Sequence, residues 1–151
     1  MMICANNPEE MFVTVWLGIL DISTGILTAA NAGHEYPAFM HSDGSFELMK
    51  RKHDLIIGAF PNTRYREYQI QMTPGSKLFV YTDGVPEAAN GAGELFGTSR
   101  MIDALNDNAG ASPRQVLLGV SEAVGSFVRD SEQFDDLTML CLEYLPGKKE
   151  Q

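Results

Sequence analysis

Cysteines, histidines in metal-binding patterns and long apolar runs are all scarce in this sequence. The chain of 151 residues has two cysteines, Cys4 and Cys141, which lie far apart and outside any Cys-x-x-Cys spacing. This argues against a disulfide scaffold or a structural zinc site. The histidines show no His-Glu-x-x-His spacing, so zinc hydrolase chemistry is not indicated. The longest apolar run, residues 11–20, is about half as long as a membrane helix requires.

The sequence also contains few positively charged residues. The chain contains 11 Lys and Arg against 20 Asp and Glu, for a net charge of −9. This balance gives no sign of the basic patch that nucleic acid or an anionic membrane surface requires. The first ten residues, MMICANNPEE, lack the positively charged start of a signal peptide, so we expect a cytoplasmic location. Hydrophobic residues at 44% and charged residues at 21% are typical of one globular domain.

Short apolar and alternating segments predict a mainly antiparallel sheet. Residues 11–20 are apolar almost throughout, which predicts a strand buried on both faces, and residues 26–33 should return as its hairpin partner. Further strands are expected at 38–41, at 46–50 and at 137–144. A second hairpin is expected where the alternating segment 68–72 turns through Pro74-Gly75 into the apolar strand 77–82.

Two helices are expected before the last strand. One covers about 98–106, and the other begins after Ser112, which forms a capping box with Gln115 and is followed by Pro113. Apolar residues from Val116 to Val128 recur at spacings of three and four, so this helix should pack against the sheet. Late helices and hairpin-joined strands together predict an α+β domain with an antiparallel sheet or sandwich.

Acidic residues stand where two apolar strands end or begin. Asp83 ends the strand 77–82, and Asp135-Asp136 precede the last strand. If these strands are antiparallel neighbours, the carboxylates meet at one sheet edge, and oxygen ligands without His or Cys favour Mg²⁺ or Mn²⁺. The residues alone leave another interpretation open, in which Asp83-Gly84 is an ordinary turn, Asp135-Asp136 a solvated loop, and the chain simply a soluble α+β domain.

Four segments, in order, resemble the metal-dependent (PPM-type) protein phosphatases of the sporulation stage II E branch. They are ILDISTGILTAANAGHEYPAFM, LIIGAFPNTRYREYQIQMTPGSKL, LFVYTDGVPEAAN with ELFG, and QFDDLTML. The resemblance implies an antiparallel β-sandwich flanked by helices, with Asp83 and Asp135 as metal ligands. Asp136 matches a position where relatives tolerate Asn, so it is the weaker candidate, and Thr138 is expected near the site but outside it.

The resemblance also implies an activity. Such domains hydrolyse phosphoserine or phosphothreonine on a bacterial regulatory protein, commonly an anti-sigma-factor antagonist, with water activated by two Mn²⁺ or Mg²⁺ ions and without a phosphoenzyme. His34, in the Asn-Ala-Gly-His signature, is interpreted as a turn residue bonded to nearby backbone. Arg64 and Arg66 are the nearest candidates for holding a phosphate, although Arg66 is expected to face solvent. No catalytic or substrate-binding residue is assigned.

One family motif is missing from the sequence. The Gly-Asp-x-x-Gly-His-Gly turn and the Asp-rich strand, which supply the metal-bridging carboxylate, occur nowhere in residues 1–151. We therefore expect a short lead-in at 1–10, the C-terminal two-thirds of a PPM-type domain at 11–145, and a charged tail at 146–151. An N-terminally incomplete domain should bind one cation or none and should expose sheet edges that permit self-association. The alternative is a non-catalytic, phosphatase-like binding module.

Overall fold

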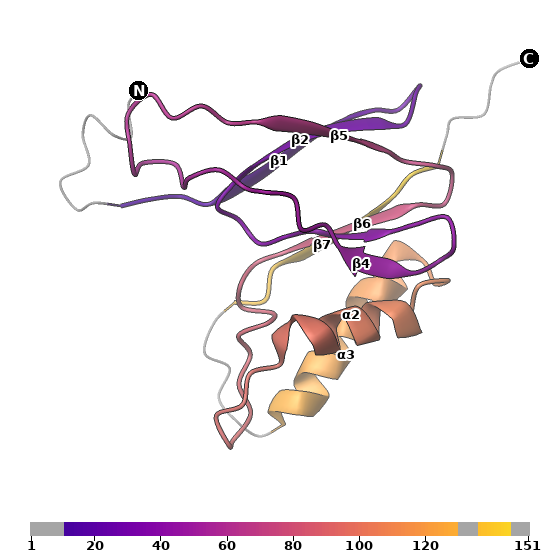
Figure 1. Cartoon of the computed structure of the whole chain (residues 1–151). Coiled ribbons are helices and arrows are strands. Elements are labelled where there is room, and N and C mark those ends of the chain that lie inside the picture. Colours follow the sequence, from indigo (N-terminus) through magenta and orange to yellow (C-terminus); the bar gives the residue numbers. More distant parts are fainter. Residues whose placement is uncertain (1–10, 130–135, 146–151) are drawn as a thin grey trace, which may run out of the picture. The chain divides into compact units, whose positions relative to one another are not determined.

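The chain folds as two compact units, each with its own antiparallel sheet (Figure 1). The structure is a computed structural model and describes residues 11–129 and 136–145. Among the described residues, the first unit contains 11–35 and 50–72, and the second contains 36–49, 73–129 and 136–145. No helix in these described ranges is long and apolar enough to cross a bilayer.

The first unit is built on a three-stranded sheet. Its strands are β1 (Val15–Asp21), β2 (Ile26–Ala32) and β5 (Glu67–Gln71), in the order β1-β2-β5. The turn between β1 and β2 is held by the Asp21 carboxylate, which accepts hydrogen bonds from the Ser23 hydroxyl at 2.6 Å and the Ser23 backbone N–H at 2.9 Å. The hairpin predicted from the sequence is therefore confirmed.

Strand β1 is not buried on both faces, so that prediction is wrong. Leu17 and Ile19 are 58% and 68% exposed, whereas Trp16 on the opposite face is partly buried and its indole N–H donates to the Tyr68 hydroxyl at 2.8 Å. Along the strand, exposed side chains alternate with partly buried ones, so one face is open to solvent. An apolar run identifies a strand, but it does not show that both faces have partners.

The second unit is built on a four-stranded antiparallel sheet. The strands follow the order β4-β3-β6-β7. Their bounds are β3 (Ala38–Met40), β4 (Phe46–Leu48), β6 (Lys77–Tyr81) and β7 (Met139–Glu143). Across the described residues, β1, β5, β4 and β7 are therefore the edge strands of the two sheets.

The predicted hairpin between β5 and β6 is absent, because the two strands belong to different sheets. Tyr68 of β5 pairs with Ala29 of β2, whereas β6 pairs with β3 and β7. Between them, the Ser76 N–H donates to the Thr73 carbonyl at 2.9 Å in a tight turn. Alternating polarity shows which face of a strand is buried, but it does not select the strand's neighbour.

Helices α2 (Gly97–Asp107) and α3 (Pro113–Val128) lie side by side on one side of the four-stranded sheet (Figure 1). Both helices and the capping box between Ser112 and Gln115 confirm the sequence predictions. The α3 stripe forms the centre of this unit's core with residues of β3, β6 and α2. The buried positions of this stripe are Val116, Val120, Val124 and Val128.

A buried lysine also fastens β6 to the helical layer. The Lys77 side chain is almost fully buried, and its ammonium donates to the Ala109 carbonyl at 2.9 Å. The Glu143 carboxylate of β7 lies 3.9 Å away, so a charge from the neighbouring strand accompanies the buried ammonium. A buried charge with such partners is retained at much lower cost than an isolated one.

Candidate metal centre

Asp83 lies at the surface, immediately beyond the paired part of β6. The β6–β7 ladder pairs Tyr81 with Met139 and continues with a hydrogen bond from the Thr82 N–H to the Thr138 carbonyl at 3.1 Å. After Thr82 the chain forms a helical turn, in which the Glu87 N–H donates to the Asp83 carbonyl at 2.9 Å. Because the next residues of this turn include the fully buried Val85, the exposed Asp83 carboxylate stands on an anchored backbone.

The acidic segment before β7 approaches the same sheet edge. Strands β6 and β7 are antiparallel neighbours, so the end of one lies beside the beginning of the other, as the metal-site hypothesis requires. Asp136 is exposed and precedes β7 by three residues. The Thr138 N–H donates to the Thr82 hydroxyl at 3.4 Å, which gives Thr138 the local role expected of it. Asp135 lies outside the described residues, so its assignment as a metal ligand stays a prediction.

The donors at this edge suit a hard divalent cation. Asp83 and Asp136 offer carboxylate oxygens, the ligands that Mg²⁺ and Mn²⁺ prefer, and both side chains face solvent. Within residues 11–129 and 136–145, no three His, Cys, Asp or Glu side chains gather closely enough to hold a metal. A cation held here by described residues would therefore keep most of its coordinated water.

The Asn-Ala-Gly-His signature forms a tightly bonded turn in the first unit. The buried Asn31 amide oxygen accepts from the His34 N–H at 2.8 Å, and its NH₂ group donates to the His34 carbonyl at 3.0 Å. Gly33 has a φ of +73°, and an added Cβ would meet the Ile56 side chain at 2.4 Å. The His34 Nδ1 lies 3.2 Å from the Thr14 hydroxyl. The signature thus builds a turn, as predicted, but the bonds within it join the Asn31 side chain to the His34 backbone, whereas the His34 ring meets the Thr14 hydroxyl instead of nearby backbone.

Arg66 is exposed, as expected, but it also has a partner that the sequence did not indicate. Its side chain is 59% exposed, but its Nε donates to the Asp54 carboxylate at 2.8 Å and its backbone N–H donates to the same carboxylate at 2.6 Å. These hydrogen bonds hold the pKa of Asp54 below its ordinary value of 3.8. Sequence alternation missed this contact, because Asp54 lies 12 residues away in a loop.

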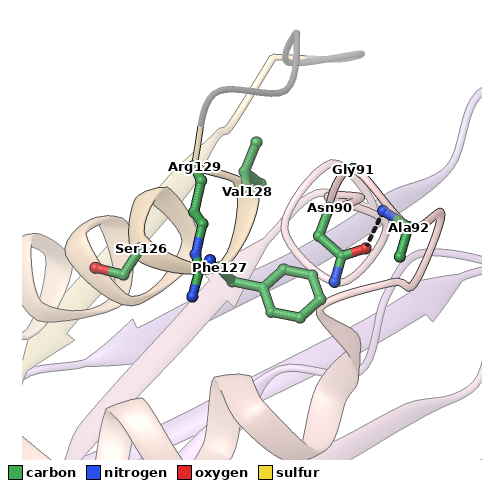
Figure 2. A pocket seen from close by; sticks show the side chains of 7 residues that line it. All are labelled: Asn90, Gly91, Ala92, Ser126, Phe127, Val128 and Arg129. Atoms are coloured by element: carbon green, nitrogen blue, oxygen red, sulfur yellow. Dashed lines mark hydrogen bonds between the residues drawn. The ribbon is translucent and has the colours of Figure 1, made fainter.

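A hollow of about 640 Å³ lies between the loop after Asp83 and the end of α3 (Figure 2). Its lining residues are Asn90, Gly91, Ala92, Ser126, Phe127, Val128 and Arg129. The Asn90 side-chain oxygen Oδ1 accepts from the Ala92 N–H at 3.0 Å, so this side chain shapes its own loop. The Phe127 ring packs edge-on against Phe96 and beneath the Arg100 guanidinium. Of the polar side chains in this hollow, Asn90 thus serves local structure.

The first unit contains a basic cluster that the net charge of the whole chain did not predict. A second hollow, of about 490 Å³, is lined by Gly33, Lys52, His53, Asp54, Leu55, Ile56 and Arg66. The available sequence signal was the run Lys50-Arg51-Lys52, with two more arginines at 64 and 66. The net charge of −9 gave no indication of this cluster, because it also counts the acidic residues elsewhere along the chain.

Comparison with known proteins shows a match over nearly the whole chain. The family model of Stage II sporulation protein E (SpoIIE) matches residues 2–145. Protein IcfG of Synechocystis sp. is 34% identical over 137 residues, which cover 91% of this chain and 21% of that protein. Phosphoserine phosphatase RsbU of Bacillus subtilis is 24% identical over 141 residues, which cover 91% of this chain and 40% of that protein. The chain thus spans between about a fifth and two fifths of these relatives.

Solved structures confirm the fold class. The SiaA-PP2C domain of Pseudomonas aeruginosa has a TM-score of 0.76 and 25% identity, with 89% of this chain and 52% of that chain covered. A structure of RsbU and RsbW domains from Mycobacterium tuberculosis has a TM-score of 0.75 and 23% identity, with 95% of this chain and 39% of that chain covered. The α+β architecture with antiparallel sheets is therefore that of PPM-type phosphatase domains.

Divalent metals occur in related structures. The phosphatase domain of SpoIIE from Bacillus subtilis, with a TM-score of 0.66 and 14% identity over 91% of this chain and 59% of that chain, was presoaked with Mn. RsbX, with a TM-score of 0.55 and 14% identity over 85% of this chain and 54% of that chain, was crystallised in complex with magnesium. These are the two metals that the oxygen donors at the β6–β7 edge favour.

Proposed function

Since this chain belongs to the Stage II sporulation protein E (SpoIIE) family, we propose that it forms part of a metal-dependent protein serine/threonine phosphatase domain. In this proposal Asp83 and Asp135 are metal ligands. The observation that carries it is the antiparallel pairing of β6 with β7, which brings the chain after Tyr81 beside the chain before Met139. In this proposal, residues more than 50 positions apart in sequence would supply carboxylates to one sheet edge.

The chain's own residues contribute position and charge. The Thr82–Thr138 hydrogen bonds hold the two ligand-bearing segments together, and the buried Val85 fixes the backbone that follows Asp83. A divalent cation bound by such carboxylates supplies a water of lowered pKa for attack on a phosphate ester and neutralises phosphate charge, so no phosphoenzyme is required. Because the Asp83 carboxylate is exposed, a cation that it held would be accessible to substrate.

The proposed substrate is a phosphorylated bacterial regulatory protein of the anti-sigma-factor-antagonist type, handled in the cytoplasm. Support comes from the 24% identical relative RsbU, which is named a phosphoserine phosphatase. Self-association through the exposed edge strands β1 and β7 is a second proposed interaction. Sedimentation across a range of concentrations tests it, and a monomer at every concentration contradicts it.

Direct Mn²⁺ binding tests the ligand assignment. Manganese EPR of the chain should detect one weak site, which Asp83→Asn and Asp135→Asn each remove. The matched control is Asp103→Asn, because Asp103 is an exposed carboxylate on α2 away from the β6–β7 edge. Binding that survives both ligand substitutions, or that falls equally in the control, would contradict the assignment.

Turnover tests the activity. Phosphate release from a phosphoserine peptide should depend on Mn²⁺ once the N-terminal part of a SpoIIE-family domain, carrying the Gly-Asp-x-x-Gly-His-Gly turn, is added to the chain. Asp83→Asn should abolish this release, because it removes a metal ligand. Absence of release under these conditions, together with unchanged partner binding by an Asp83→Asn, Asp135→Asn variant, would replace the enzyme proposal with the non-catalytic module.

A further inference from the structure

Basic side chains are concentrated in one segment of an otherwise acidic chain. Of the 11 Lys and Arg residues, five lie between positions 50 and 66, and this segment contains one acidic residue, Asp54. The segment's net charge is +4, which leaves −13 for the rest of the chain. We call the five residues the basic surface; they are Lys50, Arg51, Lys52, Arg64 and Arg66. Such a separation of charge within one chain creates a local positive potential.

The structure displays this charge to solvent. All five members of the basic surface are exposed, and they belong to the first unit. Lys52 and Arg66 line the hollow of about 490 Å³, whose wall also includes the apolar side chain of Leu55. Leu55 is 55% exposed. A basic rim beside an exposed apolar side chain offers both charge and apolar contact to a polypeptide.

The single acidic residue of the segment does little to cancel the surrounding charge. The Asp54 side chain is 12% exposed, and its carboxylate is occupied by the Arg66 guanidinium and backbone N–H. The Asp54 N–H donates to the Asn31 carbonyl at 2.9 Å, which ties the loop to the end of β2. The backbone is therefore anchored at Asp54 and Arg66, next to the remaining basic side chains, and such anchoring before a partner binds lowers the entropy cost of binding.

We propose that the basic surface docks an acidic segment of the phosphoprotein substrate, an inference that rests on the proposed phosphatase function. Carboxylates near the phosphoserine, or the phosphate itself, would pair with Lys52, which lines the hollow, and with Arg64, which stands two residues before the lining Arg66, while apolar substrate atoms cover Leu55. Exposed charge pairs of this kind speed the encounter of the two proteins and fix how the substrate segment aligns on the surface, and they contribute less to affinity. The surface therefore acts on substrate capture, separately from the metal ligands in the second unit.

Charge distribution favours a short acidic peptide over nucleic acid. At physiological salt, charges interact over about 8 Å, so a peptide segment can sit within the positive region. Nucleic-acid affinity depends on releasing counterions from many phosphates, which requires many basic side chains. The basic surface supplies five, and the rest of the chain has a net charge of −13.

Fluorescence anisotropy on the whole chain tests the proposal. The probe is a labelled peptide with one phosphoserine flanked by aspartates and glutamates; its comparison peptide has asparagine and glutamine at those flanking positions. Lys52→Glu and Arg64→Glu should each raise the Kd of the acidic peptide about three- to ten-fold, since each reversal exchanges an attraction for a repulsion. The matched control is Arg114→Glu, which makes the same charge change at an exposed position of α3. It should change the Kd less than about two-fold.

Three results would overturn the docking surface. They are equal weakening by Arg114→Glu and Lys52→Glu, equal affinity for the acidic and the neutralised peptide, and tighter binding of a labelled oligonucleotide than of the acidic peptide. Circular dichroism and thermal melting of each variant establish that it is folded. Lys52, Arg64 and Arg114 are exposed, so the thermal melting curves of their variants should match that of the wild type.

A further variant separates this inference from the proposed function. Measured in EDTA, so that no divalent cation can hold the phosphate, Asp83→Asn should leave the Kd of the acidic peptide unchanged, because Asp83 lies outside the basic surface. If peptide docking fails while Mn²⁺-dependent phosphate release persists, only the docking surface is wrong. If docking persists with the charge-reversal pattern described while phosphate release is absent, the phosphatase proposal fails and the basic surface remains a partner-binding site.

Discussion

Truncating Val120 at the centre of α3 should destabilise the second unit by about 1.5–2.5 kcal/mol. Val120 is completely buried in the core beneath the four-stranded sheet. Val→Ala removes the equivalent of two methylene groups, worth about 1.6 kcal/mol of transfer free energy, and the cavity left behind adds to this. Alanine's better helix propensity returns at most about 0.5 kcal/mol.

Urea denaturation followed by far-UV circular dichroism measures this loss. Leu118, two residues away on the same helix, is 51% exposed, so Leu118→Ala should change the free energy of unfolding by no more than about 0.5 kcal/mol. The midpoint should fall for Val120→Ala while the slope of the transition stays constant. An equal or larger loss for Leu118→Ala would refute the position of α3 on the sheet.

Three further predictions concern single side chains. Ser112→Ala should destabilise the protein by about 1 kcal/mol, because the α3 capping box is lost, as urea titration would show. Asp54→Asn should destabilise at neutral pH, and its difference from wild type should shrink as the pH falls below 3.8, since the Arg66 hydrogen bonds lower the pKa of Asp54. Cys141 should alkylate slowly at neutral pH, with a rate that climbs until about pH 11, because burial raises the pKa of its thiol to about 11.

Each of these has its own control. Ser112→Asp should retain most of the capping energy, and an equal loss in both variants would contradict the cap as its source. For Asp54, a difference from wild type that is constant down to pH 2 would contradict the ion-paired carboxylate. The thiol measurement uses a Cys4→Ser variant, in which Cys141 is the sole cysteine. An alkylation rate that levels off near pH 9 would show an unperturbed thiol.

The sequence located the acidic residues of the candidate site but did not show that their strands are neighbours. Strand endings located Asp83 and Asp135-Asp136, but their meeting depended on a condition, namely that the two strands be antiparallel neighbours. Pairing of Tyr81 with Met139 meets that condition. Arg66 shows the opposite case: its neighbours along the chain indicated a solvent-facing side chain, and its partner Asp54 comes from a loop that no local pattern connects to it.

The sequence by itself determined the local features of this protein: both helices, the capping box at Ser112, the β1–β2 hairpin and the strand ends that carry the acidic residues. These depend on interactions between residues close along the chain, so periodicity and turn chemistry reveal them. Only the tertiary structure decided that β5 pairs with β2 instead of β6, that Leu17 on β1 is exposed, and that Asp54 fastens Arg66. Those outcomes depend on which distant segments compete for the same hydrogen bonds and apolar surface, and that competition is settled only when the whole chain folds.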